Sequence, residues 1–306
     1  MIPMPTPIVV LGGTGMLGTA VVRSLLQFGL PVRATARVVD EAPSDIRHHF
    51  VPFDAATDDV AALLADLGAG DYVVNCVGII KPYIHDHDAA ERRRAIAINS
   101  TLPYEIAEAA SAGGFRVIQI ATDCVYSGAK GLYDENDLFD PTDVYGKSKS
   151  LGEVPSENFL NLRCSVIGPE VKGKTSLLEW VLAHEPGSTF SGYTDHLWNG
   201  LTGQAFGRVA AGIITTGHEL SGTFHVVPSG IVSKDELSRT ILAAYGRTDV
   251  TVTPTATGHS IDRTLATVFP DVNARLWHDA GYTTIPTVEH MVYDLLRESP
   301  PIGEAP

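Results

Sequence analysis

Short apolar runs alternate with amphipathic segments through the first half of the chain. The run at 7–11 ends in glycines, and the apolar residues that follow, from Leu17 to Leu26, recur at helical spacing until Gly29. A second short strand, expected at 32–37, completes a strand-helix-strand unit of the usual size, about thirty residues. The continuous apolar character of the first run indicates a parallel sheet buried on both faces.

The same alternation predicts the elements that follow. Further strands are expected at 50–53, 72–77, 116–120 and 159–166, and helices at 60–67, 92–112 and 144–153. Beyond residue 168 the pattern loosens, with helices expected at 175–184, 203–215 and 234–245 and a strand at 222–227. The sequence therefore predicts an α/β fold: a Rossmann-type, doubly wound parallel sheet with helices on both faces. We expect a first domain over 1–168, whose sheet the strand near 222–227 joins, and a small, interleaved C-terminal lobe over 169–306.

The charge balance and composition narrow the classes of partner. The 306-residue chain has 36 acidic and 22 basic side chains, a formal net charge of −14. This excess of negative charge repels phosphate backbones and anionic membranes, so neither nucleic acid nor a membrane is expected as a partner. The N-terminal segment has no basic stretch before its apolar run, and no apolar run approaches the ~18 residues of a membrane span. Three scattered cysteines favour a reducing compartment over a disulfide framework, so we expect a cytoplasmic protein.

A glycine-rich turn joins the first predicted strand to the first predicted helix. Gly12, Gly15 and Gly18 form the pattern G-x-x-G-x-x-G. Glycines there allow a tight turn and the close approach of a pyrophosphate, whose charge is stabilised at the helix N-terminus. The placement between a strand and a helix favours dinucleotide binding over a merely structural turn.

The end of the second predicted strand bears on the choice of dinucleotide. An NAD-binding protein is expected to place an acidic residue there, about 20 residues beyond the glycines, to bind the ribose 2′-hydroxyl. This chain has Arg37 instead and no carboxylate until Asp40. Arginine pairs with a 2′-phosphate through two hydrogen bonds, which favours NADP(H), although a solvated surface arginine is the alternative. Asp54, just past the third strand, is a candidate for the adenine amino group or, equally, for a helix cap.

A tyrosine and a lysine four residues apart provide the candidate chemistry. Tyr145 and Lys149 lie at the start of a predicted helix, where the i, i+4 spacing places both side chains on one face. A neighbouring ammonium lowers the pKa of a phenol, so the pair suits proton transfer to an oxygen as hydride reaches its carbon. Thr122 ends the fifth predicted strand, at the carboxyl edge of the sheet where ligands bind, and its hydroxyl is a hydrogen-bond donor for the same oxygen. The alternative is a capping threonine and an ordinary surface helix.

Several motifs, taken together, resemble those of the extended short-chain dehydrogenases, in particular the dTDP-4-dehydrorhamnose reductase-like group of nucleotide-sugar reductases. They are GGTGMLG at 12–18, NCVG at 75–78, AINST at 97–101, ATDCVYSG at 121–128, GLYDENDLFDPTDVYGKSKSLGE at 131–153 and LRCSVIGPE at 162–170. The resemblance runs in the expected order over most of the chain, from Ile8 to Val292, and the stretch from Thr122 to Glu153 is its specific part.

The resemblance implies roles for the matching residues. Thr122, Tyr145 and Lys149 would be catalytic, and Lys149 would also hold the nicotinamide ribose. The NADP(H)-binding set would be Gly12, Thr14, Gly15, Met16, Leu17, Arg37, Asp54, Cys76, Val77, Gly78 and Lys149. The first domain would then bind NADP and the second lobe a nucleotide sugar, with Tyr145 as the proton donor to its keto group.

Departures from the family pattern leave the sugar undetermined. Cys124 and Ser127 stand where the family has tyrosine and aspartate, and the stretch 195–202 replaces the usual Pro-Thr signature of the second lobe. The candidate substrate-binding residues are Thr122, Tyr145, Lys81, Trp198, Asn199 and Arg263. Three of these have structural alternatives, namely a surface lysine for Lys81, a core position for Trp198, and a surface ion pair with its acidic neighbour for Arg263. The segment His85–Asp88 lacks the spacing of metal ligands, and no metal is expected.

Two other functions fit the same scaffold. A nucleotide-sugar epimerase or dehydratase would keep NAD bound through its cycle and commonly carries an acidic residue after the second strand. A dehydratase would also need an Asp-Glu pair after the threonine, whereas Asp123 is followed by Cys124. A non-catalytic, NADP-binding regulatory subunit is the second, and the intact Thr-Tyr-Lys set argues against it. We therefore expect an NADPH-dependent reductase of a keto group on a nucleotide-activated deoxysugar, and a homodimer is left open.

Overall fold

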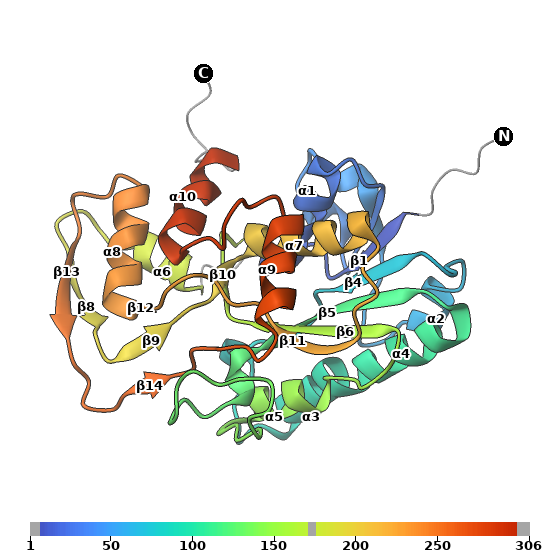
Figure 1. Ribbon diagram of the computed structural model, residues 1–306, viewed down its shortest axis with the longest axis horizontal. Coiled ribbons are helices and arrows are strands. Elements are labelled where there is room, and N and C mark those ends of the chain that lie inside the picture. Colours follow the sequence, from blue (N-terminus) through green and yellow to red (C-terminus); the bar gives the residue numbers. More distant parts are fainter. Residues whose placement is uncertain (1–6, 171–175, 299–306) are drawn as a thin grey trace.

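A seven-stranded parallel sheet forms the centre of the computed structural model, which describes residues 7–170 and 176–298 (Figure 1). The strands follow the order β11-β6-β5-β4-β1-β2-β3, and each pairs with its neighbour in parallel. They are β1 (Ile8–Leu11), β2 (Val32–Ala36), β3 (Phe50–Pro52), β4 (Tyr72–Asn75), β5 (Arg116–Thr122), β6 (Phe159–Cys164) and β11 (Gly222–His225). This sheet, flanked by helices, confirms the predicted Rossmann-type fold.

Helices cover both faces of the sheet, as the continuous apolar strands require. On one face lie α1 (Met16–Gln27), α7 (Gly203–Thr216) and α9 (Pro270–Asp279), and on the other α2 (Val60–Leu63), α3 (Ala89–Ile96), α4 (Leu102–Gly113) and α5 (Val144–Leu151) (Figure 1). Successive residues of one strand serve opposite cores: Val10 packs in the core under α1 and α7, and Val9 in the core under α2 and α4. Both side chains are fully buried.

A smaller lobe is built from segments that follow residue 168, together with the short strand that leads into it. Its helices are α6 (Leu177–Leu182), α8 (Lys234–Ala244) and α10 (Val288–Glu298), and its short strands are β7 (Val166–Ile167), β8 (Thr189–Tyr193), β9 (His196–Trp198), β10 (Leu201–Thr202), β12 (Val232–Ser233), β13 (Thr251–Thr255) and β14 (Ile261–Asp262). The strands form a β12-β9-β14 sheet and two pairs, β13-β8 and β10-β7. Three elements of this half of the chain, α7, β11 and α9, pack on the first core, so the two halves are interleaved (Figure 1).

Several boundaries differ from the sequence-based expectation. The helix expected at 92–112 begins at Ala89 and ends at Gly113, with one π-helical turn at Ala97–Thr101. The strand expected at 159–166 is divided after Cys164, and the helix expected at 60–67 ends at Leu63. The helix expected at 175–184 spans Leu177–Leu182, and Thr175 lies outside the described residues.

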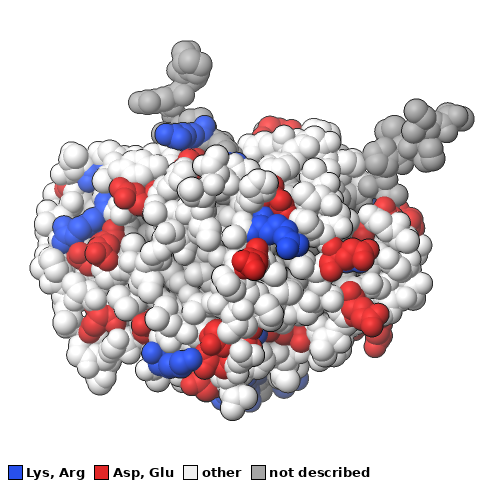
Figure 2. Space-filling view, viewed as in Figure 1, with Lys and Arg blue, Asp and Glu red and all other residues white. Residues whose placement is uncertain are grey.

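The surface carries mixed charges. On the face shown in Figure 2, acidic and basic side chains are scattered among uncharged residues. Among the described residues, no helix has both the length and the apolar character that a membrane crossing demands.

Candidate active site

The glycine-rich turn is held tightly between β1 and α1. Gly12 has a positive φ of 77°, which side chains rarely tolerate, and its N–H donates to Thr35 Oγ1 at 3.0 Å. A Cβ atom at Gly18 would overlap the carbonyl oxygen of Gly12. The turn therefore depends on glycine at both positions, one for its backbone conformation and one for the close approach of helix to turn.

The N-terminus of α1 offers backbone N–H groups to a ligand. Gly15 is the N-cap and supplies no side-chain hydrogen bond, and the first helical turn contains no acidic residue. These N–H groups and the positive end of the helix dipole suit a phosphate. Thr14 lies in the same turn, and Met16 and Leu17 are the first two residues of the helix.

The end of β4 closes the other side of this turn. A Cβ atom at Gly12 would lie 3.0 Å from Val77 Cγ2, and Cys76 N donates to Leu11 O at 3.0 Å. Gly78 follows directly and is exposed. The structure thus brings together the cofactor-binding residues predicted after β1 and after β4, which are some sixty residues apart in the sequence.

Arg37 and Asp54 lie at the neighbouring strand ends. Arg37 is exposed just beyond β2, two residues after Thr35, and makes no ion pair with a described residue. Arg33, by contrast, is paired with both carboxylate oxygens of Asp66 at 2.7 Å. Asp54 Oδ1 accepts a hydrogen bond from Ala56 N at 3.0 Å, so this carboxylate already stabilises a turn, and its contact with adenine stays a prediction.

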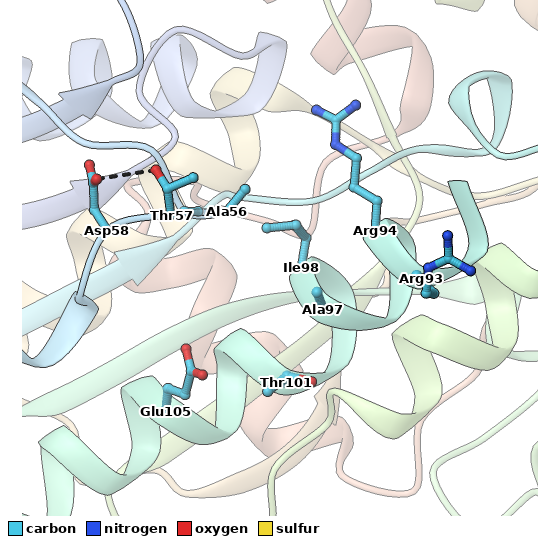
Figure 3. A pocket seen from close by; sticks show the side chains of 10 residues that line it. Ala56, Thr57, Asp58, Arg93, Arg94, Ala97, Ile98, Thr101 and Glu105 are labelled. Atoms are coloured by element: carbon cyan, nitrogen blue, oxygen red, sulfur yellow. Dashed lines mark hydrogen bonds between the residues drawn. The ribbon is translucent and has the colours of Figure 1, made fainter. Parts of the chain in front are cut away.

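A hollow of about 440 Å³ adjoins the end of β3 (Figure 3). Its walls are the loop 55–58 on one side and, on the other, helical residues from Arg93 to Glu105, with the two arginines at one end. The lining residues do not include Thr122, Tyr145 or Lys149. The hollow therefore lies on the side of the expected adenosine and apart from the chemistry.

The helix α5 approaches the end of β5 closely, and this brings Tyr145 to Thr122. Asp143 caps the helix by accepting from Gly146 N at 2.8 Å. A Cβ atom at Gly146 would overlap the carbonyl oxygen of Cys124, so only glycine allows the helix to start against this turn. The Tyr145 side chain lies close enough to Thr122 for the threonine hydroxyl to influence the phenol. Two residues that are 23 positions apart in the sequence therefore meet at the carboxyl edge of the sheet.

The protonation states at this edge favour a neutral tyrosine. Burial raises the pKa of Tyr145 above its ordinary value, and the hydrogen bond with Thr122 only partly opposes this. Lys149 is not among the main influences on the pKa of Tyr145, and its Nζ donates to the carbonyl oxygen of Ile120 at 2.9 Å. Burial lowers the pKa of Lys149 to about 8. A protonated phenol is a proton donor, which is the form that a reduction requires.

The Thr122 hydroxyl is engaged with its neighbours. It donates to Asp123 Oδ1 at 3.1 Å and accepts from Cys124 N at 3.2 Å. Donation to a substrate oxygen would require the hydroxyl proton to turn away from Asp123. Asp123 is 7% exposed, and burial raises the pKa of its carboxyl group in spite of the nearby Arg263.

Asn99 joins the loop after β4 to α5 by hydrogen bonds. Its Oδ1 accepts from Ile79 N at 2.8 Å, and its Nδ2 donates to Ile79 O at 2.9 Å and to Ser148 Oγ at 3.0 Å. Asn99 lies in the π-helical turn, a local irregularity that is frequent at functional sites. The sequence motif AINST contained this residue, but its spacing alone gave it no role.

Two predicted substrate residues, Lys81 and Arg263, lie near the start of α5 and the turn after β5. Lys81 Nζ forms an ion pair with Asp143 Oδ2 at 2.7 Å, beside the start of α5. Arg263 Nε donates to Tyr126 O at 2.9 Å, and its charge acts on Asp123 and Asp143. Arg263 thus faces the reactive end of the site from the second lobe. Contact of either residue with a substrate stays a prediction.

Trp198 and Asn199 have structural partners. Trp198 is 5% exposed in the core of the second lobe, and its indole N–H donates to Ser165 Oγ at 2.8 Å. Asn199 is buried and binds the backbone of Leu265 through both ends of its amide, at 2.7 and 2.9 Å. Both side chains are therefore buried core residues, which for Trp198 was the structural alternative to a role in substrate binding.

Sequence reasoning missed Lys234, the first residue of α8. Its charge interacts with Asp123 and Cys124 across the two lobes, and burial lowers its pKa to about 8. One signal was present in the sequence. In the stretch 233–236, Ser-Lys-Asp-Glu, the serine and glutamate form a capping box, which places a lysine where the helix dipole disfavours it.

Comparison with known proteins gives one family match and extensive structural likenesses. Residues 6–173 match the family described as RmlD substrate binding domain. A protein of Haloferax volcanii, named probable low-salt glycan biosynthesis reductase Agl14, is 31% identical over 274 residues, which cover 84% of this chain and 86% of that protein.

Two solved structures share the fold over nearly their whole length. The dTDP-4-dehydrorhamnose reductase from Clostridium acetobutylicum has a TM-score of 0.72 at 20% identity and covers 95% of this chain and 99% of its own. The dTDP-4-dehydrorhamnose reductase from Bacillus anthracis, solved in complex with NADP, has a TM-score of 0.70 at 21% identity. The likeness covers 97% of this chain and 100% of that protein's chain. Together with the family match, these likenesses confirm the resemblance to the extended short-chain dehydrogenases.

Proposed function

Because the chain belongs to the family described as RmlD substrate binding domain, we propose that it is an NADPH-dependent reductase of a keto group on a nucleotide-activated deoxysugar. The observation that carries this proposal is the meeting of Thr122 and Tyr145 beside Lys149, at the carboxyl edge of the sheet. The glycine turn at the same edge has the bare helix N-terminus that a dinucleotide pyrophosphate needs.

In the proposed reaction the protein's own groups orient the carbonyl and supply a proton. Bound NADPH contributes the hydride, which the carbonyl carbon receives. Tyr145 gives its phenolic proton to the carbonyl oxygen, and Thr122 orients that oxygen by a hydrogen bond. Lys149 holds the nicotinamide ribose and stabilises the phenolate that Tyr145 leaves behind. The raised pKa of Tyr145 keeps the phenol protonated before hydride transfer.

The two halves of the chain divide this work. We assign NADP binding to residues 1–168, whose sheet is completed by β11, and substrate binding mainly to the lobe formed after residue 168. Lys81 and Arg263 are the proposed substrate contacts at the boundary between the two. α7 and α9 serve the first core and are not part of the substrate surface.

Arg37 is expected to set the preference for NADPH over NADH. NADPH should bind at least several-fold more tightly than NADH to the parent protein. Arg37→Asp should weaken NADPH binding about 10- to 100-fold, the worth of a hydrogen-bonded charge pair, and narrow or reverse the preference. Fluorescence titration with both cofactors measures the change. Arg275→Asp, on the exposed side of α9, alters the net charge equally and should leave both affinities unchanged. Equal or tighter NADH binding by the parent would contradict the assignment.

The substrate class predicts that the nucleotide is required. Remote binding energy from a nucleoside diphosphate positions the reacting carbon, so a free keto sugar should be a far poorer substrate than its nucleotide-linked form. dTDP or UDP should inhibit the reduction, or protect the protein against thermal unfolding, at millimolar concentration or below. Arg263→Ala should raise KM more than it lowers kcat. If neither nucleotide inhibits or protects, the keto sugar is not nucleotide-activated and only the reductase assignment stands.

A further inference from the structure

Lys234 occupies a position that helix stability does not explain. It is the first residue of α8, directly after the N-cap Ser233, whose side chain and that of Glu236 form a complete capping box. A positive charge there is repelled by the helix dipole, at a cost of about 0.3–1 kcal/mol. The capping box already satisfies the helix start. The lysine therefore weakens the element that it begins.

The pairing of β12 with β9 places this lysine against Trp198. Val232 lies opposite Trp198 in the antiparallel register, and Lys234 Nζ lies 5.0 Å from the centre of the Trp198 ring. The ammonium makes no hydrogen bond or ion pair with any residue between 7 and 170 or between 176 and 298. Burial lowers its pKa to about 8, with Asp123 the largest opposing influence. A poorly solvated ammonium with unused donors has strong affinity for an oxygen acceptor.

Asp123 faces Lys234 from the other lobe. Its carboxylate is 7% exposed and takes a hydrogen bond from Thr122, the residue next to Tyr145 in space. Each of the two charges acts on the other, yet they do not form a direct ion pair. The Asp123 carboxyl group and the Lys234 ammonium are thus near enough to influence each other, and Asp123 is hydrogen-bonded to Thr122, which is proposed to orient the reacting carbonyl.

We propose that Lys234 and Asp123 together bind a hydroxyl group of the sugar, adjacent to the carbon that is reduced. This inference rests on the proposed function and adds to it a determinant of substrate specificity. A hydroxyl group donates to the carboxylate and accepts from the ammonium, so it satisfies both partners at once. An anionic group at this place would be repelled by Asp123 and a cationic group by Lys234. The site therefore selects a neutral, hydroxylated carbon beside the keto group.

The test is equilibrium binding of nucleotide hexoses to the NADP⁺-loaded protein. dTDP-glucose is compared with its monodeoxy analogues, each of which lacks one ring hydroxyl, and the UDP series is measured in parallel. The parent protein should bind one of these analogues about 10- to 100-fold more weakly than it binds dTDP-glucose. This factor is the worth of a hydrogen bond to charged groups. In Lys234→Met and in Asp123→Asn this penalty should fall below about threefold, the lower end of what a neutral hydrogen bond contributes. Lys234→Arg retains the positive charge and should therefore keep most of the binding penalty.

Two controls separate this role from a structural one. Lys147→Met removes an exposed lysine of α5 and should preserve the full penalty. The melting temperature of Lys234→Met should equal or exceed that of the parent, because the unfavourable charge at the helix start is gone. If the parent discriminates among the analogues and Lys234→Met discriminates equally, the inference is overturned while the proposed function stands. If the parent binds no nucleotide hexose of either series, the proposed function fails and the inference fails with it.

Discussion

Replacing Tyr145 with phenylalanine should lower the turnover number about 10²- to 10⁴-fold, the usual worth of a positioned proton donor. The substitution removes one oxygen atom and leaves the ring that packs at the start of α5. Because the phenol is held neutral by burial, its loss removes a proton donor and no charge. NADPH affinity and the melting temperature should therefore remain close to those of the parent. Single-turnover oxidation of NADPH, followed at its absorbance band, measures the chemical step directly.

The Lys149→Ala variant distinguishes the loss of a proton donor from the loss of a cofactor contact. The lysine is assigned to the cofactor ribose as well as to the phenol, and its ammonium is buried against Ile120 O. Its loss should reduce NADPH affinity and turnover together, whereas Tyr145→Phe should reduce turnover alone. Near-normal turnover of Tyr145→Phe with a substrate that the parent reduces would exclude the tyrosine as the acid.

The sequence predicted the parallel sheet and its flanking helices well because their signals are local. An apolar run, a glycine turn and an amphipathic helix follow one another within about thirty residues, and each can be recognised without its neighbours in space. The prediction of Tyr145, Lys149 and Thr122 as the catalytic set rests on signals of the same local kind. Two occupy one helical turn, and the third ends a strand whose direction fixes the edge at which it lies. Parallel strands of a buried sheet leave little freedom in where those ends meet.

The second lobe was less predictable, and the reason differs between its elements. Val288, Met291, Val292 and Leu295 have helical spacing, so α10 could have been recognised from its pattern. The two-residue strands, by contrast, exist only through pairing with distant segments, as β12 does with β9 and β14 with β9. Such short strands have no periodicity of their own. The place of Lys234 over Trp198 depends on this pairing and could not be derived from local sequence.

A buried ion pair next to the catalytic helix carries the largest expected effect on stability. Glu153 and Arg163 are joined at 2.6 Å, with side chains that are only 5% and 3% exposed. Arg163 also donates to the Tyr126 hydroxyl and to His225 Nε2, both at 2.6 Å. Burial, with Arg163 beside the ring, lowers the pKa of His225 to about 4, so this histidine is neutral and accepts the hydrogen bond. The cluster ties β6, β11 and the loop after β5 into one unit.

Glu153→Gln should lower the free energy of unfolding by about 3–5 kcal/mol, because it leaves the Arg163 guanidinium buried without a counter-charge. Urea denaturation measures the change, and Glu157→Gln, on an exposed residue of the same segment, should cost less than about 0.5 kcal/mol. Glu153→Met combined with Arg163→Met should recover part of the loss, since no unpaired charge remains. A loss below about 1 kcal/mol for Glu153→Gln, the level of an exposed ion pair, would show that water reaches the pair.

Glu153→Gln should also change NADPH binding, through the pKa of Lys149. Burial lowers the pKa of Lys149 to about 8, and the negative charge of Glu153 is the largest influence that opposes this lowering. Without that charge the pKa of Lys149 should fall further, toward neutrality, and a smaller fraction of the lysine would be protonated at about pH 8. The ammonium is the form that holds the ribose, so NADPH affinity should weaken at a lower pH in Glu153→Gln than in the parent. Titrating NADPH at several pH values separates this effect from the loss of stability, since unfolding would weaken binding at every pH alike.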